Sequence, residues 1–162
     1  MVNTMILSFQ RGSKAIRHFD NIVDIHKGLP AVIQDLNGCH PLYAGGYPMS
    51  LLFAPRKTEQ ITKIAEGYYQ DYDVYFPSEG NLLEAIDILD SYADVLPTNK
   101  KFETENAITY TINTSDTSIA ENPASERQVS IQVIKRIVGS PEEILQSFDF
   151  KNLAYFYFLL WP

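Results

Sequence analysis

Apolar residues in the first part of the chain recur at steps of three and four positions, which is the periodicity of an amphipathic helix. They lie between Ser13 and Asn37 and include Ile16, Phe19, Ile22, Val23 and Ile25. Gly28 interrupts the pattern, and Pro30 suits the first turn of a second helix that ends near Asn37. Residues 1–37 are therefore predicted to be an N-terminal helical segment.

Strand and helix patterns alternate through the middle of the chain. The expected elements are a strand at 41–44, helices at 48–53 and 58–67, a strand at 71–76 and a helix at 82–92. The first strand ends in Gly45 and Gly46, and Pro77 stops the second. This alternation is typical of a sheet with helices packed against it.

The last part of the chain favours strands with one short helix. The expected elements are strands at 102–113, 129–138 and 153–160 and a helix that begins at Ser140-Pro141. The polar stretch 114–128 is long for a connection in a compact domain and is predicted to be a flexible loop. The order predicts one domain over residues 1–162, in the α/β or α+β class, with a mixed sheet.

Length and composition agree with one globular domain. The chain has 162 residues, of which 45% are hydrophobic, and carries a net charge of −7. This acidic balance argues against extended binding of duplex nucleic acid, which requires a basic surface. The single Cys39, the lack of a secretory signal and the lack of an apolar run of about 18 residues predict a cytoplasmic protein without a membrane anchor.

Two motifs are candidates for chemistry. Asp71 and Asp73 lie two residues apart in a predicted strand, so they project to one face with Cα atoms about 6.5–7 Å apart. Paired carboxylates suit Mg²⁺ or Mn²⁺, and the backbone of Gly45 and Gly46 could approach a phosphate closely. The alternatives are a plain tight turn for the glycines and an exposed sheet edge for the aspartates.

Together these motifs resemble the nucleotidyltransferase superfamily of the DNA polymerase β type, especially the small members found in phages and large DNA viruses. The resemblance covers roughly residues 37–154 and lies in the segments Tyr43–Gly46, Asp71–Phe76, Val129–Ile134, Gly139–Leu145 and Phe148–Phe150. It implies transfer of a nucleotidyl group from an NTP to an RNA end, a protein or a small molecule. For a phage protein, the cytoplasm would be that of the host.

The resemblance also implies roles for individual residues. Gly45, Gly46 and Ser50 would bind the phosphates, and Asp71, Asp73 and Asp149 would hold Mg²⁺ or Mn²⁺ and act in catalysis. Glu103 and Glu105 compete with Asp149 for the third carboxylate. Lys135 and Arg136 are basic candidates, one of which should face the carboxylates, and Tyr75 is a candidate for base stacking or core packing.

One departure from the family pattern affects the functional hypothesis. Related transferases carry an Arg-Asp pair shortly after the diglycine, where this chain has Met49-Ser50. Three hypotheses follow. The chain is a metal-dependent nucleotidyltransferase, or a catalytically inactive relative that acts as a phage accessory or antitoxin-like binding factor, or a packing protein in which the two aspartates are exposed.

Overall fold

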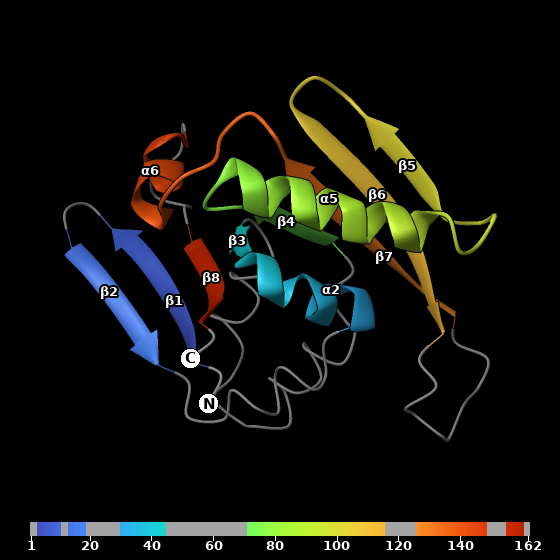
Figure 1. The fold of residues 1–162 in the computed structure, drawn as a ribbon. Helices are drawn as coiled ribbons and strands as arrows, with labels where there is room; N and C mark the ends of the chain where they lie inside the picture. Colours follow the sequence, from blue (N-terminus) through green and yellow to red (C-terminus); the bar gives the residue numbers. More distant parts are fainter. Residues whose placement is uncertain are drawn as a thin grey trace.

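A computed structural model of the chain describes residues 3–10, 13–18, 30–44, 71–115, 126–148 and 155–160. Its strands are β1 (Asn3–Gln10), β2 (Ser13–His18), β3 (Leu42–Ala44), β4 (Asp71–Tyr75), β5 (Lys100–Glu103), β6 (Ala107–Ser115), β7 (Glu126–Ile134) and β8 (Tyr155–Leu160). These described strands form one sheet in the order β2-β1-β8-β3-β4-β7-β6-β5 (Figure 1). The β4–β7 pair is parallel and the other pairs are antiparallel, so the sheet is mixed, as expected.

Helices pack on both faces of this sheet and make the fold α+β. The described helical elements are α2 (Ala31–Asp35), the 3₁₀ helix η1 (Leu36–Cys39), α5 (Glu79–Ala93) and α6 (Pro141–Gln146). Figure 1 shows α5 and α2 crossing one face, in front of β4 and β7. None of the described helices is long and apolar enough to cross a lipid bilayer.

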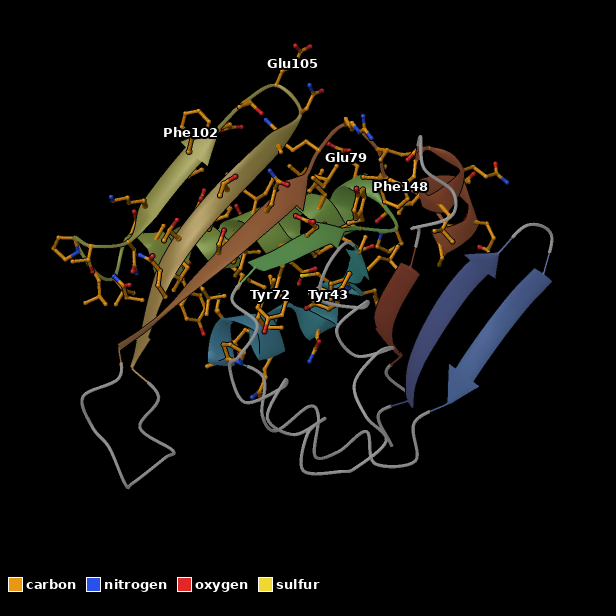
Figure 2. The ribbon with its side chains drawn as sticks, turned by 180° about the vertical axis from the view of Figure 1, so that it is seen from behind. Tyr43, Tyr72, Glu79, Phe102, Glu105 and Phe148 are labelled. Carbon is orange, nitrogen blue, oxygen red and sulfur yellow. The ribbon has the colours of Figure 1, made fainter. Side chains whose placement is uncertain are left out.

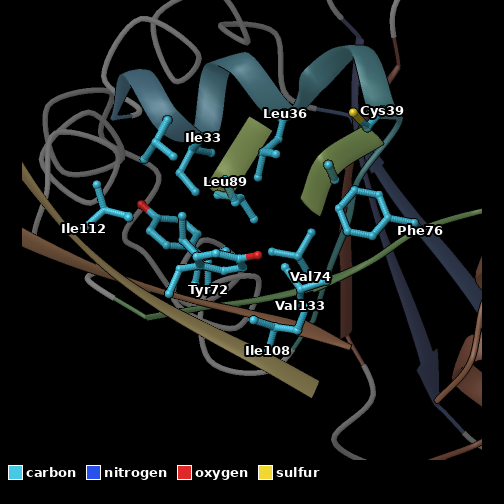
Figure 3. Packing of buried hydrophobic residues seen from close by; sticks show 14 of the residues in the cluster. Ile33, Leu36, Cys39, Tyr72, Val74, Phe76, Leu89, Ile108, Ile112 and Val133 are labelled. Atoms are coloured by element: carbon cyan, nitrogen blue, oxygen red, sulfur yellow. The ribbon is translucent and has the colours of Figure 1, made fainter. Parts of the chain in front are cut away.

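The main core lies between α5, α2 and the sheet (Figure 3). Helix α5 begins after Ser78, whose side chain accepts a hydrogen bond from the Asn81 backbone at 3.2 Å. Its buried residues, Leu82, Ala85 and Leu89, follow helical spacing and face the sheet. The sheet and the shorter helices supply further buried residues, including Ile33, Leu36, Tyr43, Tyr72, Val74, Ile108, Tyr110, Ile131 and Val133.

A smaller apolar cluster lies under α6 on the opposite face. It contains Leu42, Ala44, Tyr75, Ile144 and Leu145. The helix starts as the sequence predicts, with a Pro at its first position and a complete capping box. In that box the Ser140 Oγ accepts from the Glu143 backbone at 3.2 Å, and Glu143 accepts from the Ser140 backbone at 2.8 Å.

The N-terminal helical segment predicted for residues 1–37 is wrong over its first half. Strands β1 and β2 pair with each other, and β1 also pairs with β8 at the other end of the chain. Gln10 and Ser13 are register partners, so two residues separate the paired strands in the sequence. Pairing with a distant strand therefore overrides the local helical periodicity. The second predicted helix is present as α2 and η1.

Other predicted elements are found with adjusted limits. The strand predicted at 102–113 is divided into β5 and β6, because Thr104 forms a turn: its Oγ accepts from the Ala107 backbone at 3.2 Å. Strand β6 continues to Ser115 and β7 starts at Glu126, which leaves the central residues of the predicted loop 114–128 outside the described residues. The predicted helices at 48–53 and 58–67 also lie outside them.

Candidate functional site

The Asp71-x-Asp73 motif lies on an interior strand. Strand β4 has β3 on one side and β7 on the other, so the exposed-edge interpretation of this motif is wrong. Asp73 pairs in register with Ala44 of β3 and with Gln132 of β7. Ala44 is the last residue of β3, and Gly45 follows it in the sequence. Asp71 and Asp73 are alternate positions of β4, with Ser130 and Gln132 as their register partners on β7.

The face that carries Asp73 is polar across three strands. Six of its polar positions on β4, β7 and β6, which we call the polar sheet face, are Asp73, Ser130, Gln132, Thr109, Thr111 and Asn113. Gln132 is exposed and the others are half-buried. This side of the sheet is the one nearer the viewer in Figure 2, with α5 behind it. Such a row of amides, hydroxyls and one carboxylate offers many hydrogen-bonding groups.

Tyr75 is the next position after Asp73 on the same face of β4. Tyr75 is 5% exposed, and its ring meets Phe148 edge-on at 5.7 Å, so it packs in the core and does not present a stacking surface. Burial, followed by the negative charge of Asp73, raises the pKa of Tyr75 to about 12, while the charge of Arg136 opposes this rise.

The structure does not bring a third carboxylate to Asp73 from β3 or β7. In the register, Asp73 lies opposite Ala44 and Gln132, and Asp71 lies opposite Ser130. Among the described residues, no group of three His, Cys, Asp or Glu side chains could hold a metal ion.

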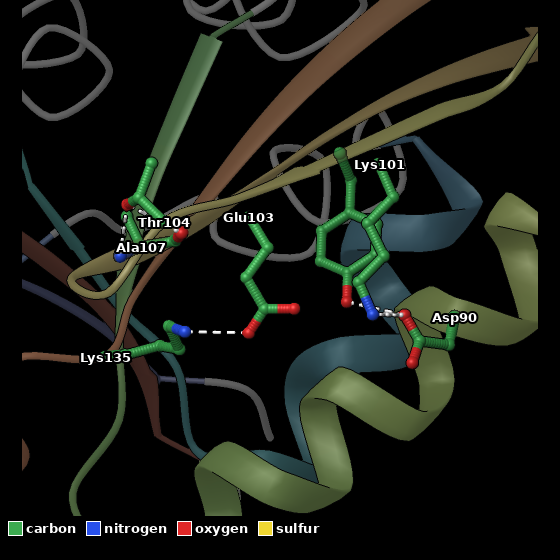
Figure 4. Close-up of polar contacts among 7 residues, drawn as sticks. Asp90, Lys101, Glu103, Thr104, Ala107 and Lys135 are labelled. Atoms are coloured by element: carbon green, nitrogen blue, oxygen red, sulfur yellow. Dashed lines mark hydrogen bonds and ion pairs between the residues drawn. The ribbon is translucent and has the colours of Figure 1, made fainter.

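Glu103 is excluded as that third carboxylate. It pairs in register with Ile108, a core residue. Glu103 therefore lies on the face of the sheet that α5 and α2 cover, which we call the helix-covered face, whereas Asp73 lies on the other face. Its carboxylate instead contacts the Lys135 ammonium at 2.7 Å, and the hydrogen bond and charge of Lys135 lower the pKa of Glu103 (Figure 4). Glu105 lies in the exposed turn between β5 and β6.

A second polar cluster, which the sequence analysis missed, connects α5 with β5 and β6. Asp90 accepts from the Tyr110 hydroxyl at 2.7 Å and contacts the Lys101 ammonium at 2.7 Å (Figure 4). The Lys101 ammonium also lies 5.6 Å from the centre of the Tyr110 ring. Partial burial raises the pKa of Asp90, but the hydrogen bonds from Lys101 and Tyr110 and the Lys101 charge outweigh it, so the pKa is lowered. Since these contacts join distant segments, local sequence patterns do not indicate them.

The remaining predicted site residues lie outside the described residues. These are Gly45, Gly46, Ser50 and Asp149. Of Asp71, the backbone and register are described, and Asp73 is the predicted ligand whose side chain is half-buried on the polar sheet face. Of the predicted site, the structure therefore describes the acidic strand β4, which lies between β3 and β7 in the sheet.

Fold and site together define an α+β protein whose mixed sheet is covered by α5 and α2 on one face, while the other face carries both α6 and the polar side chains. Residues 10–159 match the family described as Gabija anti-defense 2 family protein. The chain belongs to this family, which is a family of phage anti-defense proteins. No curated protein and no solved structure matches the chain.

Proposed function

We propose that this protein protects a phage from the Gabija defense system by binding a component of that system in the host cell. The family match over residues 10–159 carries this proposal. The polar sheet face supports it as a binding surface, because hydroxyl and amide side chains on strands offer specific hydrogen bonds at a fixed spacing.

Phage infection tests this function directly. Bacteria that carry Gabija and express the wild-type chain should support phage growth, and bacteria that carry Gabija alone should not. We expect Gln132→Lys to weaken protection, because it places a charge on the polar sheet face. Gln146→Lys makes the same change at an exposed position of α6 and should keep protection. Equal loss in both variants, or in neither, would contradict a role for this face.

Co-purification separates binding from other routes to protection. Tagged wild-type protein should retain a Gabija component from infected or expressing cells, and the Gln132→Lys variant should retain less. If protection is observed without any retained component, the binding hypothesis is wrong and a catalytic route is favoured.

The acidic strand supports a second candidate, nucleotidyl transfer. Asp71 and Asp73 are alternate positions of an interior strand, and Asp73 lies opposite Ala44, the residue that precedes Gly45-Gly46 in the sequence. These features agree with the resemblance to small nucleotidyltransferases. In this hypothesis Asp71 and Asp73 hold Mg²⁺ or Mn²⁺, which would orient and neutralise the phosphates of a bound NTP.

Calorimetry distinguishes the two candidates. Wild-type protein and the Asp71→Ala/Asp73→Ala double variant are titrated with ATP or GTP in the presence of Mn²⁺. Metal-dependent binding that the double variant loses, together with loss of protection in the infection assay, would support catalysis. A double variant that folds and still protects would exclude catalysis as the source of protection. Circular dichroism provides the control for folding.

A further inference from the structure

The outer strand β5 has an unpaired edge. It is the last strand of the described sheet and pairs with β6 alone. All four of its residues are exposed, and Phe102 is 68% exposed. Figure 2 shows Phe102 on β5 at the outer edge of the sheet. An exposed aromatic residue on an unpaired strand edge is a place where another strand can add.

The hydrogen bonds of the β5–β6 hairpin determine which backbone groups face this edge. The Thr104 backbone donates to the Ala107 carbonyl at 2.8 Å, so Thr104 points its backbone groups toward β6. In an antiparallel pair the residues alternate between pointing inward and outward. Phe102 therefore bonds to β6, and the N–H and C=O groups of Lys101 and Glu103 point to the free edge.

We propose that a second copy of this chain pairs its β5 with this edge in an antiparallel arrangement, with Phe102 opposite Phe102 about a two-fold axis. Lys101 of each copy then lies opposite Glu103 of the other. The outward N–H and C=O groups of these residues are positioned for hydrogen bonds between the copies, and the two phenylalanines occupy the non-hydrogen-bonded position, where side chains lie closest.

Charge selects this register over its neighbours. Pairing must keep Lys101 and Glu103 on the same face in both copies, so the allowed registers differ by steps of two residues. One neighbouring register places Lys101 opposite Lys101, and the other places Glu103 opposite Glu103. Like charges directly opposite each other are unfavourable. The proposed register makes two Lys101–Glu103 pairs within β5, whereas the Glu103–Glu103 register pairs Lys101 only with Glu105, which lies beyond the end of β5.

Contacts within each copy already hold the charged side chains on the helix-covered face. Lys101 contacts Asp90 and Glu103 contacts Lys135, each at 2.7 Å (Figure 4). Pairing of two copies would extend these contacts into a row of alternating charge, Asp90 and Lys101 from one copy followed by Glu103 and Lys135 from the other. The β5 edges of two copies are thus complementary in their backbone hydrogen-bonding groups, in their charged pairs and in the contact between the two Phe102 side chains.

Sedimentation velocity of the full chain, from about 10 µM to about 1 mM, tests the pairing. We expect concentration-dependent dimers of the wild type. Lys101→Glu or Glu103→Lys alone should weaken association at least about tenfold, because each replaces two attractive pairs by two repulsive ones. An equimolar mixture of the two variants should associate again, since each Glu of one chain then faces a Lys of the other.

Each variant has also lost an ion pair within its own chain, with Asp90 or with Lys135. The mixture does not restore these pairs, so recovered association would come from the contact between copies. Lys100→Glu is the matched control: it makes the same change of charge, but Lys100 lies opposite Thr104 in the proposed register, so association should persist. Phe102→Ala should weaken association. A wild type that stays monomeric, a mixture that stays monomeric, or equal loss in Lys100→Glu and Lys101→Glu would each overturn the proposal.

Discussion

The contact between Tyr110 and Asp90 should contribute measurably to stability. Tyr110 is fully buried on β6, and its hydroxyl reaches Asp90 near the end of α5 at 2.7 Å. The contact therefore connects the helix with the sheet in the outer half of the fold. A double-mutant cycle with Tyr110→Phe, Asp90→Ala and the combined variant measures its strength.

The expected coupling free energy is about 1 kcal/mol. A hydrogen bond to a charged group contributes about 1.5–3 kcal/mol when it is buried. The side chain of Asp90 is 40% exposed, so water can replace the phenol when Tyr110 is changed, and the value falls. The cycle cancels effects that belong to one residue alone, such as the better helix propensity of Ala at position 90.

Urea unfolding followed by circular dichroism provides the assay, with unfolding free energies compared at constant m value. The matched control is the contact between the Tyr92 hydroxyl and Asp35, which also joins a tyrosine to an aspartate. Tyr92 is only half-buried and Asp35 is exposed, so the control cycle should give a smaller coupling. A Tyr110–Asp90 coupling no larger than the Tyr92–Asp35 coupling would refute the reasoning.

The same contact predicts a dependence of stability on pH. The pKa of Asp90 is lowered in the folded protein, so its carboxylate stabilises the fold above the ordinary value of 3.8, and this contribution is lost as the pH falls through the folded pKa. Burial, then the contact with Asp90, raises the pKa of Tyr110 above 10.0, so stability decreases as the pH rises past 10.0. Tyr110→Phe should reduce both dependences.

Three further variants or probes test the core, the cap of α6 and the buried thiol. Leu89→Ala should lower the unfolding free energy by about 2–5 kcal/mol, whereas Leu83→Ala, at a position 55% exposed on the same helix, should cost far less; similar urea midpoints would contradict the assigned helix face. Ser140→Ala removes the acceptor for the Glu143 backbone and should cost about 1 kcal/mol in the same assay. Burial, then Glu84, raises the pKa of Cys39 to about 11, so a thiol reagent at neutral pH should label it only after unfolding, and rapid labelling of the native protein would count against this burial.

Local patterns predicted the elements that carry their own start and stop residues. Helix α5 has the Ser78 cap and the buried series that contains Leu82 and Leu89, and α6 has its capping box, so both could be located from the sequence. The first hairpin could not. Residues 13–18 begin the segment whose apolar spacing predicts a helix. They form a strand because they pair with β1, and β1 in turn pairs with β8 from the other end of the chain.

The candidate site was predictable to the extent that a single strand determines it. The period of a strand places Asp71 and Asp73 on one face, and the register confirms that this face is shared with Gln132. The position of β4 inside the sheet, and the opposite orientation of Glu103, depend on strand order. Strand order is a long-range property that no local spacing encodes, so the competing carboxylate could not be excluded from the sequence.

If the polar sheet face is the binding surface that we propose, the alternation of side chains along the strands assigns stability to one face of the sheet and recognition to the other. On the helix-covered face, Tyr110 and Ile131 are buried and Lys101 is held by Asp90, so changes there affect folding first. On the polar sheet face, Gln132 is exposed and lies over no apolar core, so a change there can be tolerated without unfolding. Gln132→Lys should therefore unfold at the wild-type urea concentration, within about 0.5 kcal/mol, even where phage protection is lost. A variant that lost both together would show that this face supports the fold and would remove it as a binding surface.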